Sequence, residues 1–205
     1  MIPALPSGLR RVCIVALVLS GLVGFRAAQD MVLVVEPPDV SALSHRGDTT
    51  DWVAGSPEQR EALEAAMRAM LASLEAWAGL RGVTLLLLSL ASGLLFVSSV
   101  RMFQPAGISR EAVRRMMVFS AMACVVLRTI DGAQLSAASQ AAGLAFVKAL
   151  EKAQPSAAEL TDIVPVLWSG AMAVLTLIVA GAFGLTWRYL RSDAVRAFTE
   201  GGSYS

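Results

Sequence analysis

Long apolar segments alternate with polar segments along this chain, and their lengths match the thickness of a lipid bilayer. The clearest is residues 83–100, which carry no charge and no proline and lie between Arg81 and Arg101. A buried helix of a soluble protein usually keeps a polar face, and this segment has none. Its 18 residues would cover about 27 Å as a helix, close to the thickness of the hydrocarbon core. The segment therefore predicts a transmembrane helix.

A second clear span is predicted toward the C-terminus. Residues 163–187 contain no charged side chain, and Trp168, Trp187 and Tyr189 lie near the two ends of this segment. Tryptophan and tyrosine are enriched where a spanning helix meets the membrane–water interface. Length and aromatic positions therefore both favour a membrane-spanning helix.

Two shorter apolar runs, residues 12–25 and 116–127, reach spanning length only if their helices continue past Arg26 and Arg128. We expect both to continue. The first run becomes apolar again at residues 31–35, before two prolines that cannot extend a helix. The four predicted spans are residues 12–35, 83–100, 113–135 and 163–187.

The N-terminus also resembles a signal peptide, because residues 1–11 end in Arg10 and Arg11 and an apolar run follows. Arg26 stands where small residues are expected before a cleavage site, and no A-x-A pattern follows it. We therefore expect residues 1–11 to be a short cytoplasmic segment that precedes an uncleaved first span.

An amphipathic helix is predicted within residues 36–82, after a polar loop. Ser56 suits the N-cap, Pro57 suits the first helical position, and Gln59 completes a capping box. The helix packs one narrow apolar face either on its own protein or on a partner or second copy. At about two heptads this face is short for a coiled coil. We call it the partner-helix seam, and its residues are Leu63, Met67, Met70, Leu74 and Trp77.

Residues 136–162 are rich in alanine and mildly amphipathic, and they predict a second extramembrane helix, in which the third helix continues or restarts outside the membrane. Before the last span, Ser156 and Glu159 predict a second capping box. A turn at residues 101–112 joins the second and third spans, with Ser109 as the next N-cap. The predicted fold is an all-α integral membrane four-helix bundle with two short extramembrane amphipathic helices on the outer side.

Small residues at four-residue spacing predict where the spans pack on one another. Ala16, Ser20 and Gly24 form such a stripe in the first span, and Ser89 and Gly93 form a pair in the second. Small residues let the backbones of two membrane helices approach closely. We therefore expect these five positions to lie at helix–helix contacts.

The distribution of charge predicts the orientation of the spans. One side holds nine arginines and three acids, whereas the segment from Asp30 to Arg81 holds nine acids and four arginines. We therefore expect both termini, including a tail at residues 188–205, to be cytoplasmic. Fifteen arginines against two lysines suggest a GC-rich bacterial source, and hence the bacterial inner membrane.

Two arginine–aspartate pairs are candidates for function. Arg26, Asp30, Arg128 and Asp131 are the ionisable residues that fall at membrane depth in this scheme. A charge there costs about 2.5–3.5 kcal/mol on insertion scales, which makes an ion or proton pathway an attractive explanation. Spacings of four and three place each aspartate beside its arginine. A simpler interpretation ends the spans at these residues, with the arginines reaching toward the outer headgroups.

Other functional classes find little support in the sequence. The chain has no P-loop, HExxH or intramembrane protease motif, so no catalytic residue is predicted. His45 is the only histidine, and Cys13 and Cys124 lie in apolar runs, so we expect no metal site and no cofactor. A net charge of +1 argues against nucleic acid as a partner.

We therefore expect a non-catalytic membrane protein, an accessory, assembly or sensing subunit that acts through helix–helix contacts. Its partners would be the lipid bilayer and other membrane subunits or a second copy of itself. The alternative is a small transporter or ion or proton pathway that uses the four charged residues. Burial of these residues around water would favour the pathway, whereas an exposed seam would favour the interaction.

Overall fold

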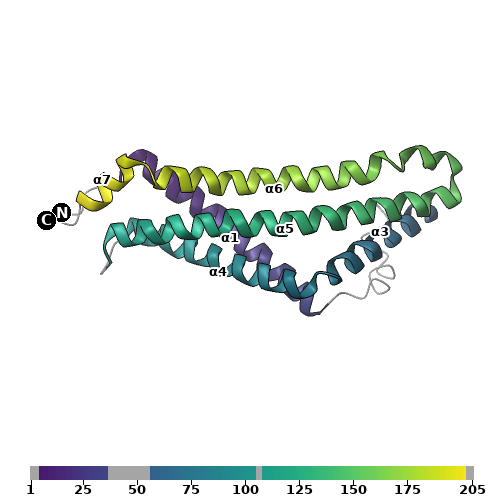
Figure 1. Cartoon of the computed structure of the whole chain (residues 1–205), viewed down its shortest axis with the longest axis horizontal. Helices are drawn as coiled ribbons and strands as arrows, with labels where there is room; N and C mark the ends of the chain where they lie inside the picture. The colour runs from purple at the N-terminus through teal and green to yellow at the C-terminus, as the bar shows by residue number, and fades with distance from the viewer. Residues whose placement is uncertain (1–4, 37–55, 105–107, 202–205) are drawn as a thin grey trace. The chain divides into compact units, whose positions relative to one another are not determined.

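The computed structural model describes residues 5–36, 56–104 and 108–201, and all regular structure in them is helical (Figure 1). Four helices are long and apolar enough to cross a membrane, so the chain is a multi-pass membrane protein. This confirms the predicted all-α class with four spans. The elements are α1 (Ser7–Val35), α3 (Pro57–Glu75), α4 (Ala78–Phe103), α5 (Arg110–Ala153), the 3-10 helix η1 (Pro155–Leu160), α6 (Ile163–Leu190) and α7 (Asp193–Gly201).

Side-chain caps mark the starts of α3 and α5, as the sequence predicts. The Ser56 hydroxyl accepts a hydrogen bond from the Gln59 N–H at 3.3 Å, and Gln59 Oε1 accepts one from the Ser56 N–H at 3.3 Å. At α5, the Ser109 hydroxyl accepts from the Ala112 N–H at 3.2 Å. These bonds satisfy backbone donors that have no partner within the first helical turn.

The segment before α6 differs from its prediction. The second capping box is wrong, because Pro155–Leu160 form η1, whose N-cap Gln154 makes no side-chain capping bond. α5 runs as one helix of 44 residues through the predicted third span and the alanine-rich segment after it. Alanine favours helix, and residues 110–154 contain no proline. The predicted loop at residues 37–55, which includes His45, lies outside the described residues.

The helices pack into two compact units, and each unit takes a part of all four long helices. Unit 2 also contains the whole of α3. Unit 1 comprises Met1–Met31, Val83–Thr129 and Leu177–Ser205, and unit 2 comprises Val32–Gly82 and Ile130–Thr176.

In unit 1, the predicted packing face of α1 is buried. Ala16 and Ser20 are almost completely inaccessible. A methyl group added at Gly24 would lie 3.1 Å from a serine side chain of α4, and the Ser89 hydroxyl donates a hydrogen bond to the Gly24 carbonyl oxygen at 3.4 Å. Gly93, the other predicted packing residue of α4, has open space around it. The contact of α1 with α4 therefore depends on Gly24.

In unit 2, α5 and α6 lie side by side and antiparallel, with glycines at the closest points (Figure 1). A methyl group added at Gly132 would overlap the side chain of Thr176. One added at Gly143 would lie 2.7 Å from the Cα atom of Pro165. At these two points, only glycine allows the present distance between the helices.

Polar and aromatic contacts near these two points complete the α5–α6 contact in unit 2. The Ser136 hydroxyl donates a hydrogen bond to the Ser169 carbonyl oxygen at 3.0 Å. The rings of Phe146 and Trp168 lie with their centroids 5.6 Å apart. The hydrogen bond fixes the register of the two helices, and the ring contact adds apolar area.

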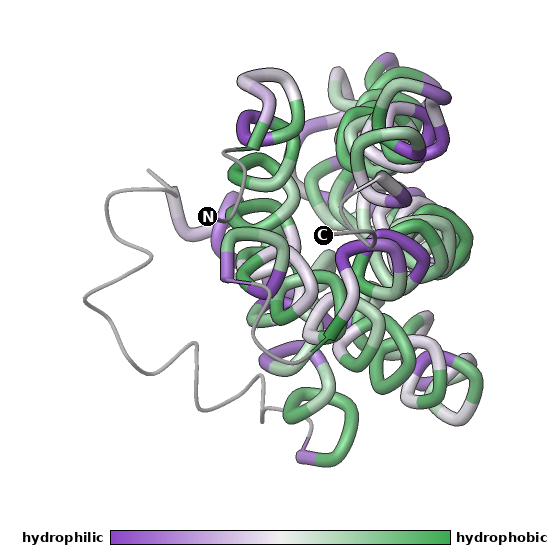
Figure 2. Tube along the Cα trace, turned by 90° about the vertical axis from the view of Figure 1, so that its left-hand side faces the viewer, coloured by the Kyte–Doolittle hydropathy of each residue, from purple (hydrophilic) through white to green (hydrophobic). Residues whose placement is uncertain are grey.

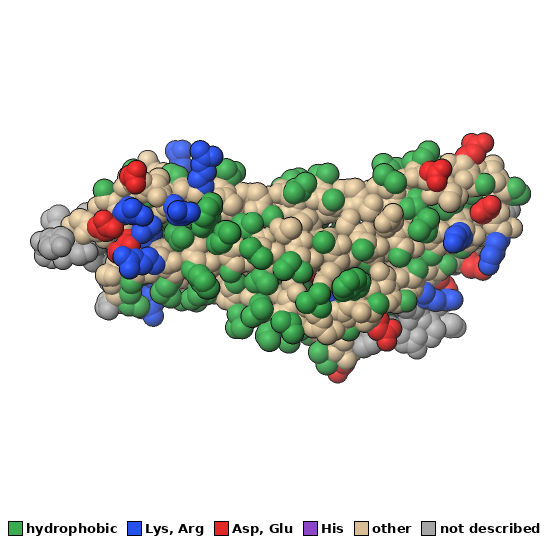
Figure 3. All heavy atoms as spheres, in the orientation of Figure 1, with side chains coloured by type: hydrophobic (Ala, Val, Ile, Leu, Met, Phe, Trp, Pro, Cys, Tyr) green, Lys and Arg blue, Asp and Glu red, His purple; other side chains and the backbone are tan. Residues whose placement is uncertain are grey.

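Large apolar side chains are exposed along both units. On α6, Val166, Leu177 and Leu185 are each more than half exposed. Hydrophobic residues predominate along the helices in Figure 2 and cover much of the face drawn in Figure 3. Soluble proteins rarely expose apolar surface on this scale, whereas acyl chains cover it without cost. The exposed apolar surface is thus suited to contact with the lipid bilayer.

Replacing Gly132 or Gly143 by alanine should destabilise the fold. The added methyl group meets Thr176 in the first case and the Pro165 backbone in the second, and overpacking of this kind costs about 1–3 kcal/mol. Gly143→Ala should be the more damaging change, because a backbone cannot rotate away as a side chain can. Thermal unfolding in detergent, followed by circular dichroism, measures the loss.

Gly170→Ala and Gly181→Ala are matched controls for this experiment. Both glycines lie in α6 with open space around them. Alanine favours helix over glycine by about 1 kcal/mol, so these variants should unfold at the wild-type temperature or above it. An equal loss of stability in the controls would show that the close α5–α6 contact is not the cause.

Candidate functional site

A buried ion pair joins the first turn of α4 to α5 within unit 2. Arg81 Nη2 lies 3.9 Å from Asp131 Oδ1, and the two residues are only 4% and 1% exposed. Opposite charges attract strongly in a low-dielectric interior, although the loss of hydration offsets much of this gain. Removal of either partner would leave the other as an uncompensated buried charge.

The pair lies level with the middle of the charge-free segment of α6. Asp131 precedes Gly132, which packs against Thr176 of α6. Thr176 lies near the middle of the charge-free residues 163–187, about 16 Å or more along the helix axis from either end. An unpaired charge at the bilayer centre costs about 2.5–3.5 kcal/mol. The contact with Arg81 therefore reduces the cost of placing Asp131 here.

A third buried polar side chain lies one helical turn further along the same face of α5. Gln134 is 7% exposed, and its position three residues after Asp131 places both on one side of the helix. Within the described part of the chain, neither Oε1 nor Nε2 of Gln134 has a hydrogen-bond partner. A buried amide without a hydrogen-bond partner lowers the stability of a protein by about 1–3 kcal/mol. We refer to Arg81, Asp131 and Gln134 as the buried polar cluster.

The other predicted pair lies on α1 in unit 1. Arg26 Nε is 3.1 Å from Asp30 Oδ1, with the Arg26 side chain 73% exposed and Asp30 buried. Such exposure agrees with an arginine that reaches toward headgroups. Arg128 is half-buried, and Asp131 pairs with Arg81 from another helix. That all four predicted charges meet at one place stays a prediction.

The partner-helix seam on α3 is only partly buried. The fully buried residues of α3 are Ala62 and Ala66, each one position before a seam residue. α3 therefore buries its smallest apolar side chains and leaves larger ones partly at the surface. Trp77, in the turn between α3 and α4, is 49% exposed. The half-buried residues of the seam are Leu63, Met67, Met70 and Leu74.

Two residues of the buried polar cluster are absent from the sequence-based prediction. Arg81 flanks the clearest span, so the charge pattern assigns it to the membrane surface. Arg81 lies inside the helix because α4 begins already at Ala78. No N-cap residue or proline in the sequence marks this start. The sequence does carry a signal for Gln134, because its spacing of three residues from Asp131 and four from Ala138 places the three on one helix face, and the structure buries all of them.

The cluster combines a carboxylate, a guanidinium and an amide. It can hold α4 against α5, or it can present a carboxylate that exchanges protons, and it contains no nucleophile activated by a base. In the described ranges, no group of His, Cys, Asp and Glu side chains could hold a metal ion. No family model, curated protein or solved structure matches this chain.

Asp131→Asn should lower the stability of the folded protein by about 3–5 kcal/mol, because it leaves the Arg81 guanidinium buried without its counter-charge. The double variant Arg81→Met/Asp131→Leu should recover most of this loss, since it removes both charges and keeps apolar volume. The unfolding temperatures of the single and double variants in detergent, each compared with wild type, measure these losses.

Arg26→Gln provides the control, because the Arg26 side chain is largely exposed. Exposed ion pairs contribute about 0–1 kcal/mol, so this variant should unfold close to the wild-type temperature. Wild-type stability in Asp131→Asn would mean that the buried pair does not hold the helices together.

Proposed function

We propose that this chain is a non-catalytic membrane protein, an accessory, assembly or sensing subunit, and that α3 is its recognition helix. The single observation that carries the proposal is the packing of α3. This helix buries Ala62 and Ala66 but leaves the larger apolar residues of its seam partly exposed, with Trp77 at 49%. Apolar side chains in such positions gain free energy when a partner covers them.

The proposal places α3 on the outer side of a bacterial inner membrane, with both chain termini in the cytoplasm. The support is the charge distribution, with nine arginines on one side and nine acids on the other. On the outer side, the seam would be available to another membrane subunit or to a second copy of the chain. Seam residues at spacings of four and three suit a partner helix.

Site-specific photocrosslinking of the full chain in membranes tests this proposal. Benzoylphenylalanine at Met70 or Trp77 should give a crosslinked product of discrete mass. Met67→Gln in the same chain should lower its yield about tenfold, because a lost apolar side chain costs about 1.4 kcal/mol or more.

The same photocrosslinker at Glu61 serves as the control, because this residue is exposed on the acidic face of α3. Equal yields from Glu61 and from the seam would mean random collision and would refute the proposal. The mass of the product separates a second copy of the chain from a different subunit.

A second candidate function, a proton or ion pathway, is favoured by the buried polar cluster. Asp131 is almost fully buried at membrane depth beside Arg81, and the amide of Gln134 lies on the same face of α5. Ionisable residues inside a membrane frequently line the routes of ions and protons. In this proposal, Asp131 is the group that gains and loses the proton, and Arg81 is the cation beside it.

Proton flux into vesicles containing the purified protein tests the pathway. Wild type should dissipate an imposed pH gradient, and Asp131→Asn should reduce this flux about tenfold or more, because amides do not titrate. Asp131→Glu keeps a carboxylate and should retain the flux. This variant provides the comparison if Asp131→Asn is too unstable to purify.

Asp162→Asn is the matched control, since it removes an exposed carboxylate next to α6. It should leave the flux unchanged. No flux above empty vesicles in wild type would exclude the pathway and would leave the cluster with a purely structural role.

A further inference from the structure

Arginines gather at the end of unit 1 where α1 and α5 begin and α4 and α6 end (Figure 3). Contacts between helices bring these ends together. A side chain added at Gly8 of α1 would overlap the Tyr189 hydroxyl of α6, and Arg114 Nη1 donates a hydrogen bond to the Leu190 carbonyl oxygen at 3.0 Å. We call this region the arginine-rich end. Its exposed arginines are Arg10, Arg11, Arg101, Arg115, Arg188, Arg191 and Arg196.

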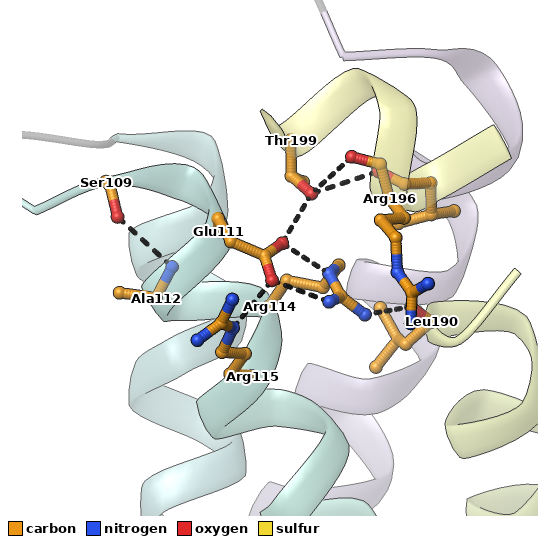
Figure 4. A network of polar contacts seen from close by, with 9 residues as sticks. Ser109, Glu111, Ala112, Arg114, Arg115, Leu190, Arg196 and Thr199 are labelled. Carbon is orange, nitrogen blue, oxygen red and sulfur yellow. Dashed lines mark hydrogen bonds and ion pairs between the residues drawn. The ribbon is translucent and has the colours of Figure 1, made fainter. Parts of the chain in front are cut away.

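Glu111 carries a single charge, which it shares between Arg114 and Arg115, so most of the positive charge at this end is left uncompensated. Its carboxylate accepts hydrogen bonds from Nε and Nη2 of Arg114 at 2.6 Å, and from Arg115 Nε at 2.7 Å (Figure 4). The bonds from Arg114 lower the pKa of Glu111 to about 2, so Glu111 stays ionised and balances the buried Arg114. The Arg115 side chain remains 73% exposed. Among the described residues here, Asp193 and Glu200 are the exposed acids.

α7 is fixed to the same end by two contacts with α5. The Thr199 hydroxyl donates a hydrogen bond to Glu111 Oε2 at 2.9 Å (Figure 4). The Arg110 guanidinium carbon lies 5.1 Å from the centre of the Phe198 ring. α7 also buries Val195. These contacts add the exposed arginine of α7 to those of the other helices.

The arginine-rich end borders an apolar, lipid-facing surface. Phe119 of α5 and Leu185 of α6 are each more than 70% exposed, and they lie close in sequence to Arg115 and Arg188. The Arg191 guanidinium carbon lies 4.8 Å from the centre of the Trp187 ring, at the end of the charge-free segment of α6. Apolar residues, then tryptophan, then guanidinium groups follow the order of acyl chain, interface and phosphate in one leaflet.

We propose that the arginine-rich end binds the phosphate groups of anionic phospholipids and selects these lipids over zwitterionic ones. A guanidinium offers paired donors that match two phosphate oxygens. In a zwitterionic headgroup, an ammonium beside the phosphate opposes the arginines, whereas an anionic headgroup carries no such group. Each arginine near an anionic surface favours binding by roughly fivefold.

Electron spin resonance of spin-labelled lipids tests the proposal on the full chain in phosphatidylcholine vesicles. The spectra measure how much more strongly labelled phosphatidylglycerol associates with the protein than labelled phosphatidylcholine. We expect a preference of about three- to tenfold at low salt, which should weaken at high salt because these charges are exposed. Arg115→Gln/Arg188→Gln/Arg191→Gln should lower this ratio by about twofold or more, although four exposed arginines remain.

Arg60→Gln/Lys148→Gln/Lys152→Gln is the matched control, because it removes the same charge from exposed positions in unit 2. It should keep the preference for phosphatidylglycerol. Equal binding of both lipids to wild type, an unchanged preference in the arginine variant, or an equal loss in the control would each overturn the proposal. The salt dependence of wild type tests it without any substitution.

Discussion

Close approach of two helix backbones is the interaction on which unit 2 depends. Within hydrocarbon, helices gain little from burying apolar surface, so contact between them relies on van der Waals packing and interhelical hydrogen bonds. Gly132 and Gly143 provide the first against α6, and Ser136 provides the second through the Ser169 carbonyl oxygen. Asp131 adjoins Gly132, so the same contact holds the carboxylate in place. The ion pair with Arg81 therefore follows from helix packing as much as from charge.

In the interior of unit 1, some buried hydroxyl groups are satisfied within their own helices. Ser99 donates a hydrogen bond to the Leu95 carbonyl oxygen of its own helix at 2.7 Å, and Ser120 donates to Met116 at 2.7 Å, whereas Ser89 donates across to Gly24 of α1. Such local bonds satisfy buried hydroxyls without demanding a partner from a neighbouring helix. The ion pairs of unit 1 include those of Glu111 at the arginine-rich end and the Arg26–Asp30 pair on α1.

The spans and the cap of α3 could be predicted because their causes are local in the sequence. Long charge-free segments and the Ser56–Gln59 box need no knowledge of distant residues. The Arg81–Asp131 pair could not be predicted in this way, since it joins residues fifty positions apart on different helices. The second capping box failed because Pro155 starts a short 3-10 helix that leaves Ser156 inside the element.

The candidate surface on α3 shows the limit of an amphipathic pattern. Apolar spacing identifies one side of the helix, but two neighbouring rows of apolar residues share that side. The row of Ala62 and Ala66 is buried, and the row of Leu63 and Met67 is only half-buried. Which of the two rows is buried depends on how closely the rest of unit 2 approaches α3. That distance is a property of the tertiary structure.

The turn between α3 and α4 is short and hydrogen-bonded on both sides, and this has a mechanical consequence. Only Ala76 and Trp77 separate the two helices. The Trp77 N–H donates to the Leu74 carbonyl oxygen at 3.1 Å, and the Trp77 carbonyl oxygen accepts from the Arg81 N–H at 2.8 Å. A displacement of α3 would therefore also displace the first turn of α4 and the Arg81 guanidinium that pairs with Asp131. Mechanical load on a surface helix and electrostatic balance inside the protein are thus linked through one short lever.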